Sequence, residues 1–148
     1  MLQLLLLGNS YTFYNDLDRV LADALDEGGH AAEATRLAEG GYRFVDHLAQ
    51  TEVSGSPWEE ALVDPGGAGS YVILQEQSQI PGFPHSSADG RDSLAAGGAL
   101  DDLAEAQGAD TVLLMTWGRR LVDADNPDLY PDFRTMQDAL ADGYLTYR

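Results

Sequence analysis

The sequence predicts an α/β domain in which helices cover a parallel β-sheet. Four short apolar runs recur along the chain, and the segments between them place apolar residues at the spacing of amphipathic helices. This alternation is typical of parallel sheets, because each parallel connection needs a crossover between its two strands. Neither an internal repeat nor a linker is visible, so we expect residues 1–148 to form a single domain.

The chain opens with a strand, a helix and a second strand. Consecutive leucines within residues 2–7 predict a strand that is buried on both faces. Asn15 or Asp16 can cap the helix that follows, and Gly28-Gly29 ends it. Residues 32–37 carry a weaker strand pattern.

Two helical segments connect the second strand to the third. Apolar spacing predicts a helix over residues 42–52, and the Ser-Gly-Ser-Pro sequence at 54–57 breaks it. Residues 58–63 allow one or two further helical turns. A turn at Pro65-Gly66-Gly67 is expected before the third strand.

The second half of the chain repeats the pattern of strand and helix. Residues 71–74 and 111–115 are apolar runs that predict the third and fourth strands, with a long helix over residues 88–107 between them. Pro131 suits the first turn of a last helix. The residues expected to face inward from that helix are Phe133, Met136, Leu140 and Tyr144.

Composition excludes several classes of partner. The chain has 25 acidic residues and 8 arginines but no lysine, for a net charge of −17. A surface of this sign repels nucleic acids and anionic membranes, so neither is expected as a partner. The absence of cysteine excludes disulfides and a thiol nucleophile. The N-terminal leucine run lacks the basic flank of a signal peptide and is too short to cross a membrane, so a cytoplasmic location is expected.

Functional residues of open parallel sheets gather beyond the carboxyl ends of the strands. The loop after the first strand contains Gly8-Asn9-Ser10. A turn there can expose the Ser10 hydroxyl, and the Ser10 N–H, close to the start of a helix, can stabilise an oxyanion. The same residues also suit an ordinary helix-capping turn. The phosphate-binding pattern Gly-x-x-x-x-Gly-Lys is absent, and no cofactor is expected.

The other loops at this edge hold further candidates. Gly41 follows the second strand, where its N–H can approach a substrate or where the glycine simply ends the strand. Gln75 and Gln77 follow the third strand and could donate to an oxyanion or satisfy the backbone of their own loop. Tyr11 and Trp117 could line a substrate pocket or pack along the rim.

Two charged segments follow the fourth strand. Arg119-Arg120 could anchor an anionic substrate, although pairing with surface carboxylates is the favoured interpretation. Residues 123–128 superficially resemble a calcium loop. They lack the glycine and the distal glutamate of an EF-hand, so we expect a solvated acidic turn and no metal.

Several of these segments together resemble one enzyme superfamily. Residues 4–14, which include Gly8-Asn9-Ser10, resemble the first block of the SGNH or GDSL hydrolases, in the branch where Gly-Asn-Ser replaces Gly-Asp-Ser. Gly41 matches the glycine of the second block, residues 71–78 are similar to the third block, and Thr116-Trp117 fits the same branch. The match covers most of the chain in order and spacing.

The resemblance implies a three-layer α/β/α, flavodoxin-like sheet with strand order 2-1-3-4. It also implies hydrolysis of a small-molecule ester, either an O-acetyl ester or one with another short acyl chain, without a cofactor. Ser10 would be the nucleophile. The N–H groups of Ser10 and Gly41, with an amide from Gln75 or Gln77, would form the oxyanion hole.

The sequence departs from the superfamily towards its C-terminus. The superfamily takes its base and orienting acid from an Asp-x-x-His pair, whereas the residues three positions before His30, His47 and His85 are Glu, Phe and Gly. We therefore expect a domain without the fifth strand and the closing segment, and an enzyme that is impaired. His85 is the one local candidate for a substitute base, although a solvated loop histidine is the favoured interpretation.

A second interpretation belongs to a different class of protein. The chain would then be a non-catalytic flavodoxin-like domain that binds a small molecule or a partner subunit. Without a fifth strand, the fourth strand would be an exposed edge, which favours pairing with another chain. A homo-oligomer formed through this edge is therefore a hypothesis.

Overall fold

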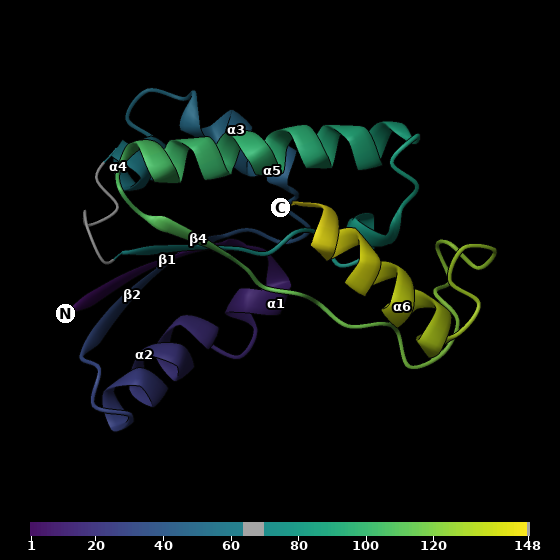
Figure 1. Ribbon diagram of the computed structural model, residues 1–148, viewed down its shortest axis with the longest axis horizontal. Helices are drawn as coiled ribbons and strands as arrows, with labels where there is room; N and C mark the ends of the chain where they lie inside the picture. Colours follow the sequence, from purple (N-terminus) through teal and green to yellow (C-terminus); the bar gives the residue numbers. More distant parts are fainter. Residues whose placement is uncertain (64–69, 148) are drawn as a thin grey trace.

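A computed structural model describes residues 1–63 and 70–147. At its centre lies a parallel sheet (Figure 1). Its strands follow the order β2-β1-β3-β4. The strands are β1 (Leu2–Gly8), β2 (Ala32–Ala38), β3 (Tyr71–Leu74) and β4 (Asp110–Leu113). The predicted α/β class and the strand order 2-1-3-4 are confirmed. The turn expected at Pro65-Gly66-Gly67 lies outside the described residues.

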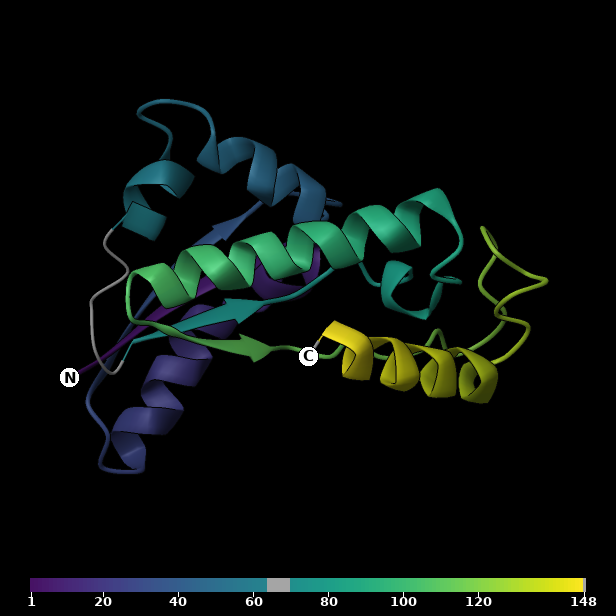
Figure 2. The ribbon, with the colours of Figure 1, turned by 45° about the horizontal axis from the view of Figure 1, so that its top comes forward.

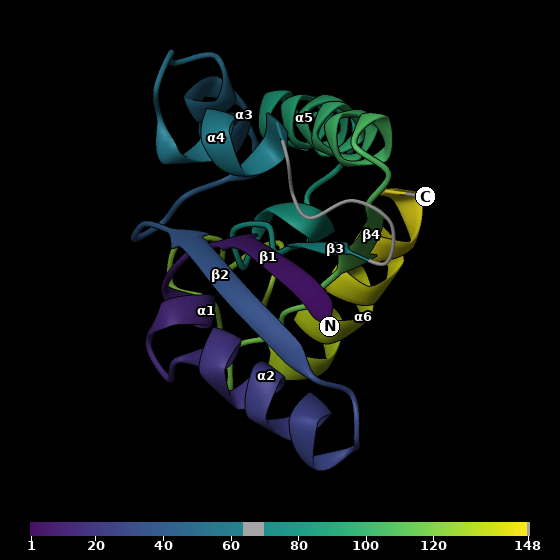
Figure 3. The same ribbon diagram turned by 90° about the vertical axis from the view of Figure 1, so that its left-hand side faces the viewer.

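Helices cover both faces of the sheet. They are α1 (Ser10–Phe13), α2 (Leu17–Glu27), α3 (Phe44–Thr51), α4 (Pro57–Val63), α5 (Ala88–Ala106) and α6 (Phe133–Tyr144), with 3₁₀ turns η1 (Ile80–Gly82) and η2 (Leu145–Tyr147). The α3, α4 and α5 helices cover one face, and α1 and α2 lie on the other (Figure 3). The α6 helix lies beyond the carboxyl ends of the strands and packs on η1 (Figure 2).

The leucines of β1 lie at the centre of the core. Leu5 and Leu7 pack against the layer of α3, α4 and α5, whereas Leu4 and Leu6 face α2. Both faces of this strand are therefore buried, which explains its continuous apolar run. The α2 face is covered less completely, because no residue of α2 is buried and Val20 is 56% exposed.

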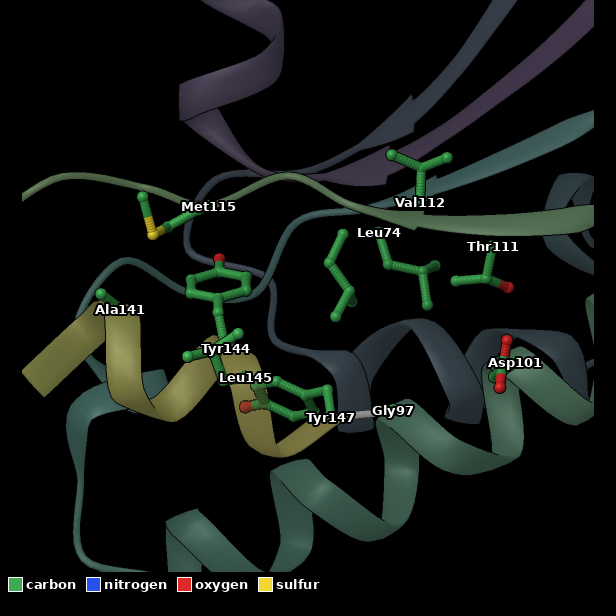
Figure 4. Close-up of a pocket in the computed structure, with 11 residues that line it drawn as sticks. Leu74, Gly97, Asp101, Thr111, Val112, Met115, Ala141, Tyr144, Leu145 and Tyr147 are labelled. Atoms are coloured by element: carbon green, nitrogen blue, oxygen red, sulfur yellow. The ribbon is translucent and has the colours of Figure 1, made fainter.

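The strand β4 lies at one edge of the sheet. A mostly apolar cavity of about 610 Å³ separates it from α5 and from the end of α6, where the Tyr144 ring points towards the sheet (Figure 4). Pairing of two chains through this edge stays a prediction. Among the described helices, none combines the length and the apolar character that are needed to cross a membrane.

Candidate active site

Ser10 lies at the first turn of the short helix α1, directly after β1. Asn9 caps this helix, and its Oδ1 accepts a hydrogen bond from the Tyr11 N–H at 3.2 Å. The Ser10 N–H makes no hydrogen bond within residues 1–63 and 70–147, and the residue is partly exposed. An unused N–H at a helix start can bind an anion, because its partial positive charge points out of the helix.

Asn9 joins three loops of the sheet edge. It is 2% exposed, its backbone N–H donates to Gln75 Oε1 at 3.1 Å, and its Nδ2 donates to the Tyr42 carbonyl at 2.9 Å. Gly41 precedes Tyr42 and has a φ of +76°, a conformation that favours glycine. In the part of the chain that the structure describes, the Gly41 N–H also has no hydrogen-bond partner. Two unused N–H groups therefore come from neighbouring loops.

The two candidate glutamines have different environments. Gln75 is fully buried, its Oε1 accepts from Asn9, and its Nε2 donates to the Glu76 carbonyl. This side chain therefore holds the first loop in place and has no access to a substrate. Gln77 is partly exposed, and its Nε2 donates one hydrogen to Gln79 Oε1 at 3.1 Å. Of the two glutamines, Gln77 is therefore the partly exposed one, and one of its amide hydrogens has no partner in the described residues.

The loop after β4 reaches across the end of β3 and contacts the helix α1 that follows β1. The rings of Tyr11 and Trp117 lie 5.0 Å apart. Arg119 Nη1 donates to the Tyr11 hydroxyl at 2.7 Å, and Nη2 donates to Ser78 Oγ at 3.3 Å. The two residues expected to contact a substrate thus lie side by side at the edge that holds Ser10.

None of the three histidines forms a hydrogen bond with Ser10 in the described structure. His85, the one local candidate for a substitute base, places Nε2 at 3.3 Å from Thr146 Oγ1 in η2. His30 is exposed at the start of β2. Within the described residues, therefore, no imidazole is hydrogen-bonded to Ser10 in this structure.

His47 has a structural role that the sequence did not reveal. It is fully buried, and Nε2 lies 2.9 Å from the Gly8 carbonyl while Nδ1 accepts from Trp58 Nε1 at 2.9 Å. Because an indole nitrogen only donates, Nδ1 is unprotonated and Nε2 carries the hydrogen. Burial lowers the His47 pKa to about 4. The position of His47 three residues after Phe44, on the inward face of the predicted helix, is the signal that could have indicated this burial.

Glu76 is a second buried group that sequence reasoning missed. Its Oε1 accepts from the N–H groups of Phe44 at 3.0 Å and Gln77 at 2.6 Å, and its Oε2 accepts from Ser93. The Ser93 hydroxyl also contacts the Tyr147 hydroxyl at 2.7 Å. Burial raises the Glu76 pKa, although these hydrogen bonds oppose the effect. This one carboxyl group therefore connects β3, α3, α5 and η2.

Replacement Glu76→Gln is expected to raise the melting temperature at pH 8. A raised carboxyl pKa means that the folded chain binds its proton more tightly, so wild-type stability falls as the pH rises above the ordinary value of 4.5. Glutamine can keep both backbone contacts without a buried charge. In thermal unfolding, the difference in melting temperature between Glu76→Gln and the wild type should be smaller at pH 4.5 than at pH 8. For the control Glu52→Gln, at an exposed site, this difference should not depend on pH. A lower melting temperature for Glu76→Gln at pH 8 would contradict this account.

The acidic segment 123–128 is partly internal rather than a solvated turn. Asp123 is 3% exposed, and its Oδ2 accepts from Gln79 Nε2 at 2.7 Å and from Asn126 Nδ2 at 3.2 Å. These contacts hold the loop after β4 against η1. Within the described residues, no three acidic or histidine side chains gather in a way that could hold a metal ion.

No protein-family model matches the sequence, and no curated protein matches it significantly. Solved structures do match. A candidate SGNH hydrolase from Slackia heliotrinireducens aligns with a TM-score of 0.77 and 28% identity, over 99% of this chain and 73% of that one. TesA aligns with a TM-score of 0.63 and 18% identity, and the alignment covers 99% of this chain and 72% of TesA. The psychrotrophic esterase EstA from Pseudoalteromonas sp. aligns with a TM-score of 0.56 and 13% identity, and the alignment covers 96% of this chain and 71% of EstA.

Proposed function

From the fold that this chain shares with the SGNH/GDSL hydrolases, we propose that it carries the serine site of an SGNH-type esterase that acts on an O-acetyl or other short-chain ester. The arrangement around Ser10 supports this most directly. Ser10 is partly exposed, and within the described residues its own N–H and the N–H of Gly41 in the adjoining loop are both unused. Asn9 connects these two loops through Tyr42.

The proposed chemistry is attack on an ester carbonyl. Ser10 Oγ adds to the carbonyl carbon and loses its proton, while the carbonyl oxygen becomes an oxyanion. The N–H groups of Ser10 and Gly41, with the Gln77 amide, would bind that oxyanion. Collapse of the intermediate breaks the ester C–O bond and releases the alcohol with a proton. Water then hydrolyses the acyl-serine to the free acid.

Removal of the Ser10 proton should limit the rate. No histidine forms a hydrogen bond with Ser10 in the described structure, and His47 is hydrogen-bonded to the Gly8 carbonyl and to Trp58. A serine without a base is a poor nucleophile at neutral pH. In triad enzymes that lose the serine or the histidine, a rate enhancement of about 10³–10⁴ over water remains from the oxyanion hole and binding. We therefore propose that turnover by this chain is slow.

Slow release of acetate from 4-nitrophenyl acetate is expected for the wild-type chain, with an acetyl adduct at Ser10 detectable by mass spectrometry. Ser10→Ala should lose both signals, because it lacks the hydroxyl. The logarithm of the rate should rise with pH without an inflection near 6.5, since no imidazole accepts the proton. Ser86→Ala, at an exposed loop serine, is the matched control. Wild-type release at the buffer rate, or equal release by Ser10→Ala, would contradict the proposal.

The missing contact between Ser10 and a histidine also favours a second function. A chain with this site could bind a small ester without converting it, as a non-catalytic binding domain. Binding of a stable ester analogue by the wild-type chain, without acetylation of Ser10 by the activated ester, would support this function over the first.

A further inference from the structure

A cavity of about 590 Å³ lies beside α1, between Tyr11 and the loop after β4. The residues that line it are Tyr11, Trp117, Gly118, Arg119, Arg120 and Phe133. Trp117 is 59% exposed, and Phe133, which was expected to face inward, is 47% exposed. Removing a large aromatic side chain from water lowers the free energy of the system. Exposed rings around a cavity therefore indicate a surface that a ligand covers.

The two arginines of this cavity differ in how they are held. Arg119 is bound by the Tyr11 and Ser78 hydroxyls, and its Nε lies 4.0 Å from the buried Asp123 carboxylate. Asp123 therefore offsets much of the Arg119 charge. No acidic side chain of residues 1–63 and 70–147 forms an ion pair with the exposed Arg120. The cavity thus holds about one uncompensated positive charge, in a chain whose net charge is −17.

The strand order places this cavity relative to Ser10. Gly41 follows β2, on one side of β1, whereas Trp117 and Arg120 follow β4, on the other side. Ser10 follows β1 and lies between the two. An ester whose carbonyl oxygen points to the Gly41 N–H would therefore direct one of its substituents into the aromatic cavity.

We propose that this cavity binds a carboxylate-bearing substituent of the ester, with a ring of that substituent against Trp117 and the carboxylate on Arg120. The assignment as a substrate subsite rests on the proposed function. A guanidinium group pairs well with the two oxygens of a carboxylate. One uncompensated charge matches a monoanion better than a phosphate dianion, so the substrate class is a short-chain ester of an aromatic or cyclic alcohol that also carries a free carboxylate.

A binding measurement tests the subsite without turnover. Ser10→Ala protein is titrated with 3-phenylpropionate and with its neutral amide, and the NMR signal of the Trp117 indole N–H reports binding at this cavity. The acid is expected to bind about fivefold more tightly than the amide, as for an exposed ion pair. Arg120→Gln should remove this preference. Arg19→Gln, which makes the same charge change on α2, should keep it.

Three results would overturn the inference. They are equal affinities for the acid and the amide, an equal loss of preference in Arg19→Gln, and tighter binding of phenyl phosphate than of 3-phenylpropionate. Absence of acetylation at Ser10 would instead contradict the proposed function and would leave the binding result unaffected, because the titrated protein has no serine at position 10.

Discussion

Lowering the pH from 7 to 4 is expected to remove roughly 3 kcal/mol of folding free energy through His47. Burial lowers the pKa of this histidine from the ordinary 6.5 to about 4. Between these values the unfolded chain binds a proton that the folded chain does not bind. The contribution to stability is therefore complete above about pH 6.5 and is lost as the pH falls towards 4. A protonated Nδ1 could no longer accept the Trp58 hydrogen bond.

Urea unfolding of the wild-type chain and of His47→Gln at pH 7, 5.5 and 4 measures this effect. Glutamine can still donate to the Gly8 carbonyl and accept from Trp58, but it does not titrate. The stability difference between the two proteins should narrow steadily as the pH falls, whereas His30→Gln, at an exposed position, should follow the wild type. The same pH dependence in wild type and His47→Gln would show that His47 is not the group responsible.

Replacement Gly143→Ala is expected to cost about 3 kcal/mol of folding free energy and to lower the melting temperature by roughly 10 °C. A Cβ atom at this position would lie 1.6 Å from the Pro81 carbonyl oxygen, which belongs to η1. Because that oxygen is a backbone atom, α6 would have to move away from η1. The buried side chains of Leu140 and Tyr144 would then lose contacts.

Gly98→Ala in α5 is the matched control for this prediction. A Cβ atom there meets nothing within 4 Å among the described residues, and the position is exposed. Alanine is preferred over glycine in a helix, so this variant should gain about 0.5–1 kcal/mol. If Gly143→Ala melted within a degree or two of the wild type, the close packing of α6 on η1 would be refuted.

The strands and longer helices could be predicted because their apolar spacing reports local structure. The short elements α1, η1 and η2 span too few residues for a periodic pattern. Phe133 shows a further limit. Helical spacing indicates which residues share a face, but it does not indicate whether another element covers that face, and the Phe133 side chain, predicted to face inward, is about half exposed.

The candidate site could be located because parallel strands bring their carboxyl ends to one edge. This rule placed Tyr11 and Trp117 at the same edge of the sheet, and the structure shows in addition that their rings are in contact. The roles of Gln75, His47 and Glu76 could not be predicted, because they depend on partners that are remote in sequence. Gln75 contacts a residue 66 positions away, for example. Such contacts leave no periodic trace in the sequence.

The amide of Asn9 has a consequence for the charge beside the nucleophile. Its oxygen accepts from Tyr11, and its nitrogen donates to the Tyr42 carbonyl. An aspartate at this position could replace the first contact but not the second, since an ionised carboxylate cannot donate. It would also add a negative charge next to the place where an oxyanion is proposed to form. The Asn9 amide therefore makes both contacts of the turn without adding a further negative charge beside Ser10 in this acidic chain.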